Sequence, residues 1–388
     1  MRAADAVFDF DTAIDRAGTW SLKHDRYGSR DVIPMWVADM DFRSPPAVIE
    51  ALRRQLEHGI FGYIEPGPEL AAAIIDRLDA SYGWRPHPDW FVWLPGLVSG
   101  LNIVCRAVGE PGDDVLTGVP IYPPFLSAPL NAQRRCVRVP LTPDGTTWRF
   151  EAAALESAMG DRSRLFLLCN PHNPVGRVYD RRELEALAEV CLRRDVVICA
   201  DEIHCGLVLD PDRRHVPLAS LDDRIAQRTI TLMAASKTFN LPGLGSAFAI
   251  IPDAELRRRV SGVMRGIVHR PMTLGLWATL AAYRDGEPWR TALVEYLRGN
   301  RDRVEATIGA WPGFGITHAE ATYLSWIDAR ASGIDQPARA FEQSGVGLYD
   351  GADFGAPGFL RLNFACPRAT LDLALRRMEQ VVRMKTGR

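Results

Sequence analysis

The sequence predicts an α/β protein with two parts, a large domain built on a mostly parallel sheet flanked by helices and a smaller α+β domain. In the middle of the chain, short apolar runs alternate with helical patterns, as is typical of βα units. From about Thr291 the pattern changes to a helix, mixed strand signals and a closing helix. The 388 residues exceed one typical domain. We expect residues 1–45 to contribute to the small domain and the active-site entrance, 46–285 to form the large domain, and 286–388 to form the C-terminal small domain.

Three apolar runs in the middle of the chain predict strands that are buried on both faces. They are Arg164–Cys169, Val196–Ala200 and Thr229–Met233. The segment Arg181–Arg194 between the first two has apolar residues at helical spacing and predicts a crossover helix.

The predicted small domain begins with an amphipathic helix from about Thr291 through Arg303. Strand signals follow at Tyr323–Trp326 and Phe359–Phe364, and a helix closes the chain. Mixed helix and strand signals of this kind are typical of an α+β unit.

Composition favours a small-molecule partner. The net charge of −2 and a pI near 6.5 leave no broad basic field for a nucleic acid or an anionic membrane. The amino terminus is acidic and lacks the apolar stretch of a signal peptide, and no segment is long enough to span a bilayer. The seven cysteines include no C-x-x-C pair. We therefore expect a cytoplasmic protein without a metal site.

Polar residues follow each of the three buried runs directly, in the segments Asn170–Gly176, Asp201–His204 and Ala234–Phe239. Ligands of open α/β sheets bind beyond the carboxyl ends of the strands, so these segments are predicted to meet at one crevice. A lysine there, Lys237, can be desolvated to the neutral amine that forms Schiff bases. The alternative interpretation of Lys237 is a lysine that extends from the strand end into solvent.

Asp201 has two interpretations as well. An aspartate at a strand end is commonly a helix cap or a turn residue. A buried carboxylate in this crevice would instead keep a pyridine nitrogen protonated, as pyridoxal 5′-phosphate (PLP) requires.

Taken in order, the motifs Asn170–Gly176, Asp201–His204 and Ser236–Leu244 resemble fold-type I PLP enzymes of the class I/II aminotransferase family. The resemblance covers nearly the whole chain. More narrowly, Pro34–Phe42, Phe61–Tyr63 and Pro120–Phe125 resemble the MalY/PatB branch, whose members are cystathionine β-lyases and related C–S lyases.

The resemblance implies roles for four residues around the cofactor. Lys237 forms the Schiff base, Asp201 pairs with the pyridine nitrogen, and Asn173 donates to the ring oxygen. His204 occupies the position where many relatives have a tyrosine facing the same oxygen. Its alternative is a buried imidazole satisfied by the backbone.

The resemblance also implies that Tyr122 stacks on the cofactor ring, although it could be an ordinary core tyrosine. The phosphate would bind backbone amides at a helix start, formed by Gly96, Leu97 and Val98. Many relatives place a serine three residues before the lysine, but this chain has Ala234 there, so Ser236 is expected to substitute.

Arg361 resembles the arginine that clamps the substrate α-carboxylate in this family, and the alternative is a structural ion pair. Ala38, through its amide, and Asn173 are expected to help bind the same carboxylate. Arg270 lies where aspartate-type aminotransferases hold a distal carboxylate, which leaves substrate choice open.

The resemblance implies a PLP-dependent β-lyase that cleaves cystathionine or a related cysteine S-conjugate to a thiol, pyruvate and ammonia. An aminotransferase is the main alternative, because the same lysine, aspartate and arginine serve both reactions. A regulatory protein that acts through protein contacts is a third hypothesis. The resemblance further implies a homodimer in which Tyr63 reaches the cofactor phosphate of the neighbouring subunit.

Overall fold

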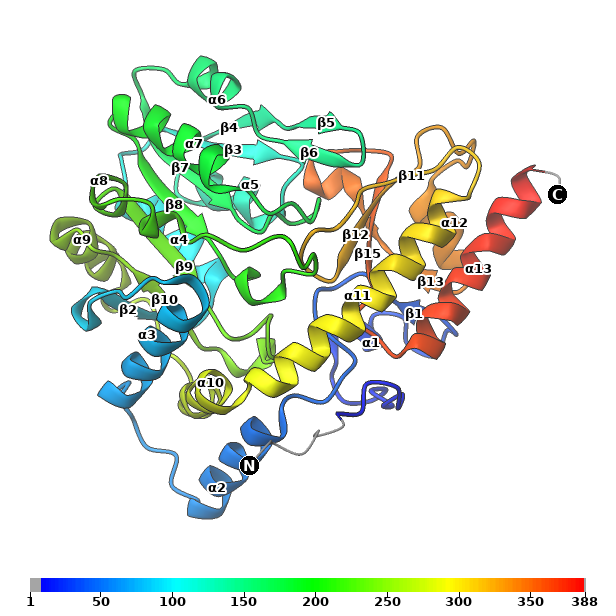
Figure 1. The fold of residues 1–388 in the computed structure, drawn as a ribbon, viewed down its shortest axis with the longest axis horizontal. Coiled ribbons are helices and arrows are strands. Elements are labelled where there is room, and N and C mark those ends of the chain that lie inside the picture. The colour runs from blue at the N-terminus through cyan, green and yellow to red at the C-terminus, as the bar shows by residue number, and fades with distance from the viewer. Residues whose placement is uncertain (1–7, 387–388) are drawn as a thin grey trace.

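The computed structural model describes residues 8–386, and its largest element is a seven-stranded sheet with the order β2-β10-β9-β8-β7-β3-β4 (Figure 1). Neighbouring strands from β4 to β9 run parallel, and β10 is antiparallel to both of its neighbours. The strands are β2 (Phe91–Leu94), β3 (Asp114–Val119), β4 (Arg135–Pro140), β7 (Ser163–Cys169), β8 (Val197–Asp201), β9 (Thr229–Met233) and β10 (Ala247–Ile250).

Alternating side chains of these strands build a core on each face of the sheet. In β7, Leu165 and Leu167 pack with one group of helices, whereas Phe166 and Leu168 pack with another. The first group consists of α4 (Leu97–Ala107), α5 (Pro124–Asn131) and α9 (Ala254–Met264). The second consists of α6 (Ala152–Ala158), α7 (Arg181–Arg193) and α8 (Asp223–Ala226), with α3 (Pro68–Tyr82) and α10 (Thr273–Asp285) over the β9–β10 end.

The three predicted strands and the crossover helix are confirmed to within one residue. Helix α7 begins with a capping box, in which the Asp180 side chain accepts from the Glu183 amide and the Glu183 side chain accepts from the Asp180 amide. The α/β fold class is therefore confirmed.

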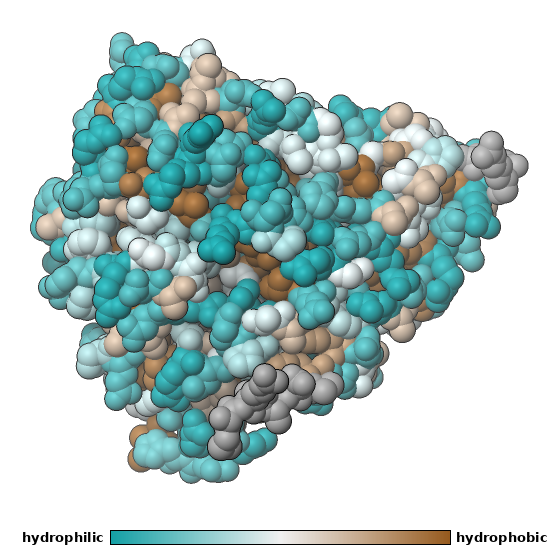
Figure 2. Space-filling model, viewed as in Figure 1, coloured by the Kyte–Doolittle hydropathy of each residue, from teal (hydrophilic) through white to brown (hydrophobic). Residues whose placement is uncertain are grey.

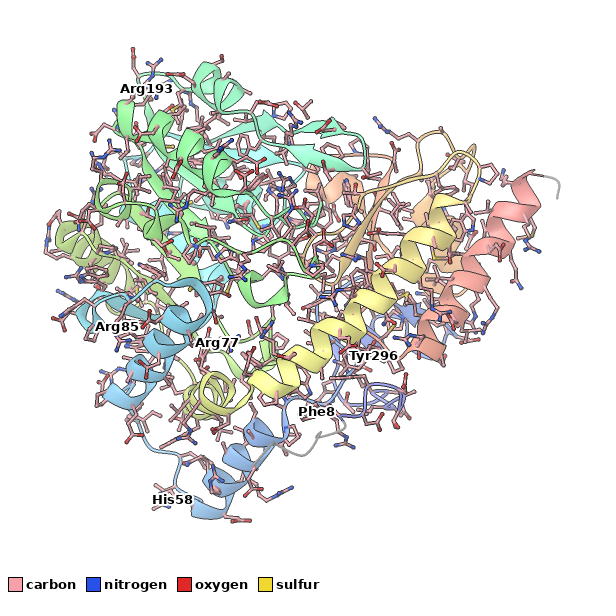
Figure 3. All side chains as sticks on the ribbon, viewed as in Figure 1. Phe8, His58, Arg77, Arg85, Arg193 and Tyr296 are labelled. Carbon is pink, nitrogen blue, oxygen red and sulfur yellow. The ribbon has the colours of Figure 1, made fainter. Side chains whose placement is uncertain are left out.

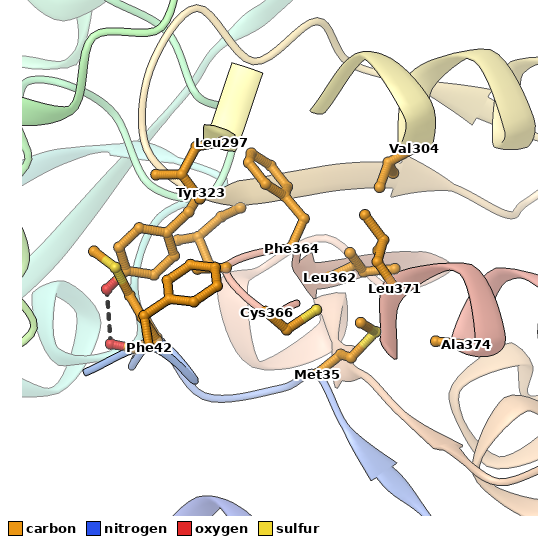
Figure 4. Packing of buried hydrophobic residues seen from close by; sticks show 14 of the residues in the cluster. Met35, Phe42, Leu297, Val304, Tyr323, Leu362, Phe364, Cys366, Leu371 and Ala374 are labelled. Carbon is orange, nitrogen blue, oxygen red and sulfur yellow. Dashed lines mark hydrogen bonds between the residues drawn. The ribbon is translucent and has the colours of Figure 1, made fainter. Parts of the chain in front are cut away.

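The C-terminal part holds a four-stranded antiparallel sheet with the order β11-β12-β15-β14. Its elements are α11 (Glu287–Gly309), β11 (Gly315–Ile316), β12 (Leu324–Asp328), α12 (Pro337–Gln343), β13 (Val346–Gly347), β14 (Tyr349–Asp350), β15 (Phe359–Asn363) and α13 (Arg368–Thr386). Figure 4 shows apolar side chains of α11, β15 and α13 packed with Met35 and Phe42 of the N-terminal segment.

The helix predicted from Thr291 through Arg303 is longer than expected at both ends. Pro288 occupies the first turn of α11, where its missing N–H leaves no hydrogen bond unmade. Val304 and Ile308 are fully buried and continue the apolar stripe of Leu293 and Leu297, so packing carries the helix on to Gly309.

The N-terminal segment packs on the C-terminal part. Strand β1 (Ile33–Pro34) pairs in parallel with β13, and Phe8 and Tyr296 of α11, both labelled in Figure 3, pack on the same apolar cluster. The Tyr296 hydroxyl donates to Asp11 at 2.6 Å. The predicted domain boundaries at 45/46 and 285/286 stay a prediction. The remaining elements are α1 (Leu22–Asp25), α2 (Pro46–His58), β5 (Thr142–Asp144), β6 (Thr147–Arg149) and five short 3-10 turns among residues 8–386.

The face of the molecule drawn in Figure 2 is mostly hydrophilic, with apolar side chains scattered between charged ones. Within the described chain, no helix is both long enough and apolar enough to cross a bilayer.

Candidate active site

A cavity of about 430 Å³ lies where the parallel strands end, and most of the predicted site residues line it. Asp201 is the last residue of β8, and Lys237 follows β9 after a short turn. The predicted residues in the lining are Ala38, Gly96, Leu97, Val98, Tyr122, Asn173, Asp201, His204, Ser236, Lys237 and Arg361. Segments far apart in the sequence therefore meet at one place, as the strand-end argument requires.

Lys237 presents a free amine in this cavity. Its Nζ donates to the carbonyl oxygen of Ala38. Burial, and then the charge of Arg361, lower the pKa of Lys237 to about 8. A neutral amine, which is the form that attacks a carbonyl carbon, is thus accessible near neutral pH.

Asp201 is a buried carboxylate that accepts one hydrogen bond, from the amide of Ile203 at 3.1 Å. Burial raises the pKa of Asp201 to about 7, and the neighbouring charge of Glu202 adds to this rise. A protonated pyridine nitrogen against the carboxylate would stabilise its charged form, so the environment of Asp201 fits PLP.

Arg361 is a buried guanidinium, 1% exposed, and no acidic side chain of the described residues pairs with it. Its nitrogens donate to Asn173 Oδ1 at 3.0 Å and to the carbonyl oxygen of Trp36 at 2.8 Å, while Nε has no partner in the described chain. Burial lowers the pKa of Arg361 to about 10. An unpaired buried cation favours an anionic ligand, and residues 8–386 contain no ion pair at Arg361 of the kind considered above.

Asn173 and Tyr122 are joined through the backbone, since the amide of Tyr122 donates to the carbonyl oxygen of Asn173 at 3.1 Å. The bond from Arg361 uses Asn173 Oδ1, so the Asn173 NH₂ group is available to a ligand in the cavity. The Tyr122 ring borders the same space.

His204 is 2% exposed, and its Nδ1 has no hydrogen-bond partner in residues 8–386. Burial, and then the charges of Lys237 and Arg361, lower the pKa of His204 to about 3, so the imidazole is neutral. A neutral ring with an unpartnered nitrogen can bond a ligand oxygen.

The start of α4 also lines the cavity, with Gly96 at the N-cap followed by Leu97 and Val98. The free amides of this first turn suit a phosphate dianion. Ser236 lines the cavity nearby, whereas Ala234 is buried in the core.

Three residues that sequence reasoning missed also belong to this site. Trp36 and Tyr349 line the cavity. Tyr323 is 1% exposed and donates its hydroxyl to the carbonyl oxygen of Ala38 at 3.0 Å, the oxygen that Lys237 also contacts (dashed line in Figure 4). Trp36 and Tyr323 lie in segments noted from the sequence, Pro34–Phe42 and Tyr323–Trp326, but no spacing shows that these side chains, or Tyr349, face the cavity.

The Asn170–Gly176 loop is held by a close approach at Gly176, which has φ +69°. A Cβ there would lie 2.8 Å from the Cα of Ala319, so only glycine fits. The amide of Ala321 donates to the Gly176 carbonyl oxygen at 2.9 Å, which fixes the loop that carries Asn173.

Two residues named from the sequence lie outside the cavity of their own chain. Tyr63 is 99% exposed. Arg270 is exposed and pairs with Glu65, which is also exposed. Neither side chain contributes to the cavity lining.

The donor set fits PLP. It offers an amine, a buried carboxylate, an aromatic ring, a helix start for the phosphate, and unpartnered polar atoms on His204 and Arg361. No group of three or more His, Cys, Asp or Glu side chains in residues 8–386 could hold a metal ion.

A lysine and an aspartate at the carboxyl ends of a mostly parallel sheet, together with an arginine of the C-terminal sheet that has no acidic partner in residues 8–386, form a site typical of enzymes that bind amino acids through PLP. The chain belongs to the family of class I and II aminotransferases, which matches residues 30–378.

Comparison with known proteins gives relatives over almost the whole length. Cystathionine beta-lyase PatB of Bacillus subtilis is 37% identical over 383 residues, covering 96% of this chain and 99% of that protein. The crystal structure of OvoB is 44% identical with a TM-score of 0.94, covering 97% of this chain and 99% of that one. Cystalysin of Treponema denticola, whose structure contains PLP, is 30% identical with a TM-score of 0.93 over 97% of this chain and 99% of that one.

Proposed function

We propose that this protein is a PLP-dependent C–S β-lyase that acts on cystathionine or a related cysteine S-conjugate. The observation that carries the proposal is the convergence of Lys237, Asp201 and Arg361 on one cavity, in a chain similar to a cystathionine beta-lyase over 96% of its length. The balanced reaction converts the S-conjugate and one water to a thiol, pyruvate and ammonium.

Lys237 would hold PLP through its amine, and the same amine is the base that takes the Cα proton of the substrate. PLP, when bound, draws electron density away from the substrate Cα through its protonated ring. The pKa of Lys237, about 8, suits an amine that must accept and return a proton near neutral pH.

Arg361 orients the substrate by binding its α-carboxylate through paired hydrogen bonds, and the NH₂ group of Asn173 and the amide of Ala38 support it. After Lys237 removes the Cα proton, the Cβ–S bond breaks and its electron pair leaves with sulfur. The thiolate then takes a proton, and water hydrolyses the released product to pyruvate and ammonia.

The other residues would hold the cofactor. Asp201 would keep the pyridine nitrogen protonated, and Tyr122 would stack on the ring. Asn173 and His204 would bond the ring oxygen. Gly96, Leu97 and Val98, at the first turn of α4, and the Ser236 hydroxyl would bind the phosphate.

We further propose a cytoplasmic homodimer in which Tyr63 bonds the phosphate of the neighbouring subunit's cofactor. Its 99% exposure and its position outside its own cavity support this role. Ile60 and Phe61, close to Tyr63 in the chain, are also exposed, and so are Ile267 and Met272 on either side of Arg270, which pairs with Glu65. Exposed large apolar side chains are common at interfaces.

The test is to incubate the purified holoenzyme with L-cystathionine and a set of S-substituted cysteines and to measure pyruvate and free thiol. We expect both products in equal amounts without an added keto acid. Product formation that requires a keto-acid acceptor would identify an aminotransferase instead.

The Lys237 assignment is tested by borohydride reduction of the holoenzyme and peptide mapping. We expect the cofactor on Lys237 and no turnover by Lys237→Ala. A label on another lysine would overturn the assignment.

A further inference from the structure

The cavity has a region that the proposed cofactor contacts leave free, and this region is apolar and aromatic. It is lined by Leu22, Trp36, Val37, Pro242 and Tyr349. Arg361 borders this region, since it donates to the Trp36 carbonyl oxygen and its guanidinium lies over the Tyr349 ring. Since Arg361 holds the substrate α-carboxylate in the function proposed above, the sulfur substituent of the substrate must lie against the apolar wall.

The two rings of this wall are fixed in place. Trp36 and Tyr349 meet edge to face, with centroids 5.9 Å apart and an interplanar angle of 78°. The Trp36 Nε1 donates to the Lys23 carbonyl oxygen at 3.1 Å, and the guanidinium of Arg26 lies 4.3 Å from the Trp36 ring centroid. Tyr349 also packs edge to face with Phe354, 4.9 Å away. A ring that enters the cavity therefore meets a surface that needs no rearrangement.

The wall begins next to the carboxylate anchor. The carbonyl oxygen of Trp36 accepts from Arg361 at 2.8 Å, and the Arg361 guanidinium lies 5.1 Å from the Tyr349 ring centroid. A substrate whose carboxylate binds Arg361 consequently has its side chain within reach of both rings.

Beyond Leu22 and Pro242 lies a second hollow of about 620 Å³, and its carboxylates are already paired. Arg16 bonds Asp39 at 2.9 Å and Asp41 at 2.7 Å. The buried amine of Lys23 also bonds Asp41, at 2.7 Å. The distal ammonium of a substrate such as cystathionine would thus find no free carboxylate there.

We infer that the preferred substrates are cysteine conjugates whose sulfur carries an aromatic ring, held by Trp36 and Tyr349. Trp36, Tyr349 and Leu22 are the residues that determine this specificity. The inference rests on the proposed lyase function, but it concerns recognition of the sulfur substituent and not the chemistry at Cα.

Binding of uncleavable analogues to the holoenzyme tests the inference without the influence of leaving-group strength. In each analogue a methylene replaces sulfur: L-homophenylalanine for an S-phenyl conjugate, its cyclohexyl counterpart, L-norvaline for S-methylcysteine, and L,L-2,7-diaminosuberate for cystathionine. Competitive inhibition and calorimetry should give L-homophenylalanine a Kd about tenfold below those of norvaline and diaminosuberate, and about threefold below that of the cyclohexyl analogue. Equal or tighter binding of diaminosuberate, or equal binding of the cyclohexyl analogue, would overturn the aromatic preference.

Substitution of Trp36 tests whether the apolar wall causes the preference for an aromatic substituent. Trp36→Leu should reduce the ratio of affinities for homophenylalanine and norvaline about fivefold. The matched control is Trp20→Leu, because Trp20 is 97% exposed and lies outside the cavity lining. An unchanged ratio in Trp36→Leu would refute the assignment. Pyruvate release from any S-substituted cysteine reports separately on the lyase function, so a failure of either proposal can be recognised.

Discussion

At the scale of single residues, the most informative group is Arg361, because a buried guanidinium without a carboxylate partner destabilises the fold. Its bonds to Asn173 and to the Trp36 carbonyl are to neutral oxygens, and its Nε is unpartnered in residues 8–386. Natural proteins retain such strain mainly where a ligand relieves it. Replacing Arg361 by an uncharged residue should therefore weaken substrate binding without lowering the stability of the fold.

Arg361→Met removes the buried charge and keeps much of the side-chain volume. We expect kcat/KM to fall by about 10²–10³-fold, mainly through KM, because charge-assisted bonds to the carboxylate worth about 3–4 kcal/mol are lost. Thermal stability should be unchanged or higher, and the cofactor should remain bound. Arg330→Met, at an arginine 61% exposed on the same part of the molecule, is the control. Normal kinetics together with a lower Tm would contradict the assignment.

Tyr323 and Lys237 both donate to the carbonyl oxygen of Ala38, and Tyr323→Phe tests whether the Tyr323 hydroxyl affects the pKa of Lys237 through that oxygen. Without the hydroxyl, Ala38 O keeps Lys237 as its remaining side-chain donor, so the ammonium form of the freed lysine is favoured and the pKa of Lys237 rises above its value of about 8. We expect kcat to fall about 3–10-fold with little change in KM, as about 1 kcal/mol corresponds to that range.

The pH profile separates this effect of Tyr323→Phe from simple damage. Since the base must be neutral, the acidic limb of the kcat profile should move to higher pH. A lower kcat with an unmoved limb would show that Tyr323 acts only in packing.

At the scale of elements, the middle of the sheet could be predicted from the sequence because buried parallel strands are continuous apolar runs that local composition reveals. The ends of α11 could not, because burial of Val304 and Ile308 against distant residues extends that helix. Strands β13 and β14, two residues each, exist through pairing with β1 and β15 and leave no periodic signal. Trp36 and Tyr323 lie in segments that the sequence did mark, but their positions at the cavity depend on tertiary packing that no local pattern reveals.

One ionic cluster fixes the segment that packs on the Asn173 loop. His318 bonds Glu305 of α11 at 2.8 Å and Asp210 at 3.0 Å, and Asp210 also bonds Arg301. Glu305 further accepts from the amide of Ala319, the residue that lies against Gly176. The bonds to Glu305, and then to Asp210, raise the pKa of His318 to about 9 despite partial burial.

This cluster predicts a pH-dependent contribution to stability. A folded-state pKa above the unfolded value of about 6.5 stabilises the protein fully below pH 6.5, and the contribution is lost as pH rises through about 9. His318→Gln should therefore lower stability at pH 6 by about 1.5 kcal/mol, the low end for charged hydrogen bonds, because His318 is 32% exposed. The difference should be much smaller at pH 10. Thermal unfolding of the wild type and of His318→Gln at both pH values measures this difference in stability, and His87→Gln is the control at an exposed histidine. An equal difference at pH 6 and pH 10 would refute the ionic origin.

At the scale of the whole molecule, the site is assembled from distant parts of the chain. Ala38 comes from the N-terminal segment, Lys237 and Asp201 come from the central sheet, and Arg361 comes from β15. Asn240 joins two of these parts, since its side chain accepts from the amide of Met40 at 3.0 Å and donates to the carbonyl oxygens of Met40 and Phe42. Within a single chain Tyr63 lies outside the cavity lining, so the proposed role of Tyr63 requires a second subunit.

Mixed dimers test whether Tyr63 acts across the subunit interface. A chain with Lys237→Ala is paired with a chain with Tyr63→Ala, and the heterodimer is isolated through two affinity tags. If Tyr63 serves the neighbouring site, one site collects both defects, whereas the other has an intact lysine and an intact tyrosine. If Tyr63 serves its own chain, both sites are damaged. We expect about half of the wild-type activity, given two independent sites in a closed C₂ dimer.

Loss of the Tyr63 hydroxyl should weaken cofactor retention, because a phenol that donates to a phosphate forms a charge-assisted bond worth about 1.5–3 kcal/mol. The Tyr63→Ala homodimer should accordingly release PLP about 10–100-fold more readily in dialysis. The heterodimer should retain tightly only the PLP of the site with both intact groups. Because Tyr63 is 99% exposed in the single chain, packing within its own subunit supplies no alternative reason for such a loss. Heterodimer activity no higher than that of the two parent variants would refute the shared site.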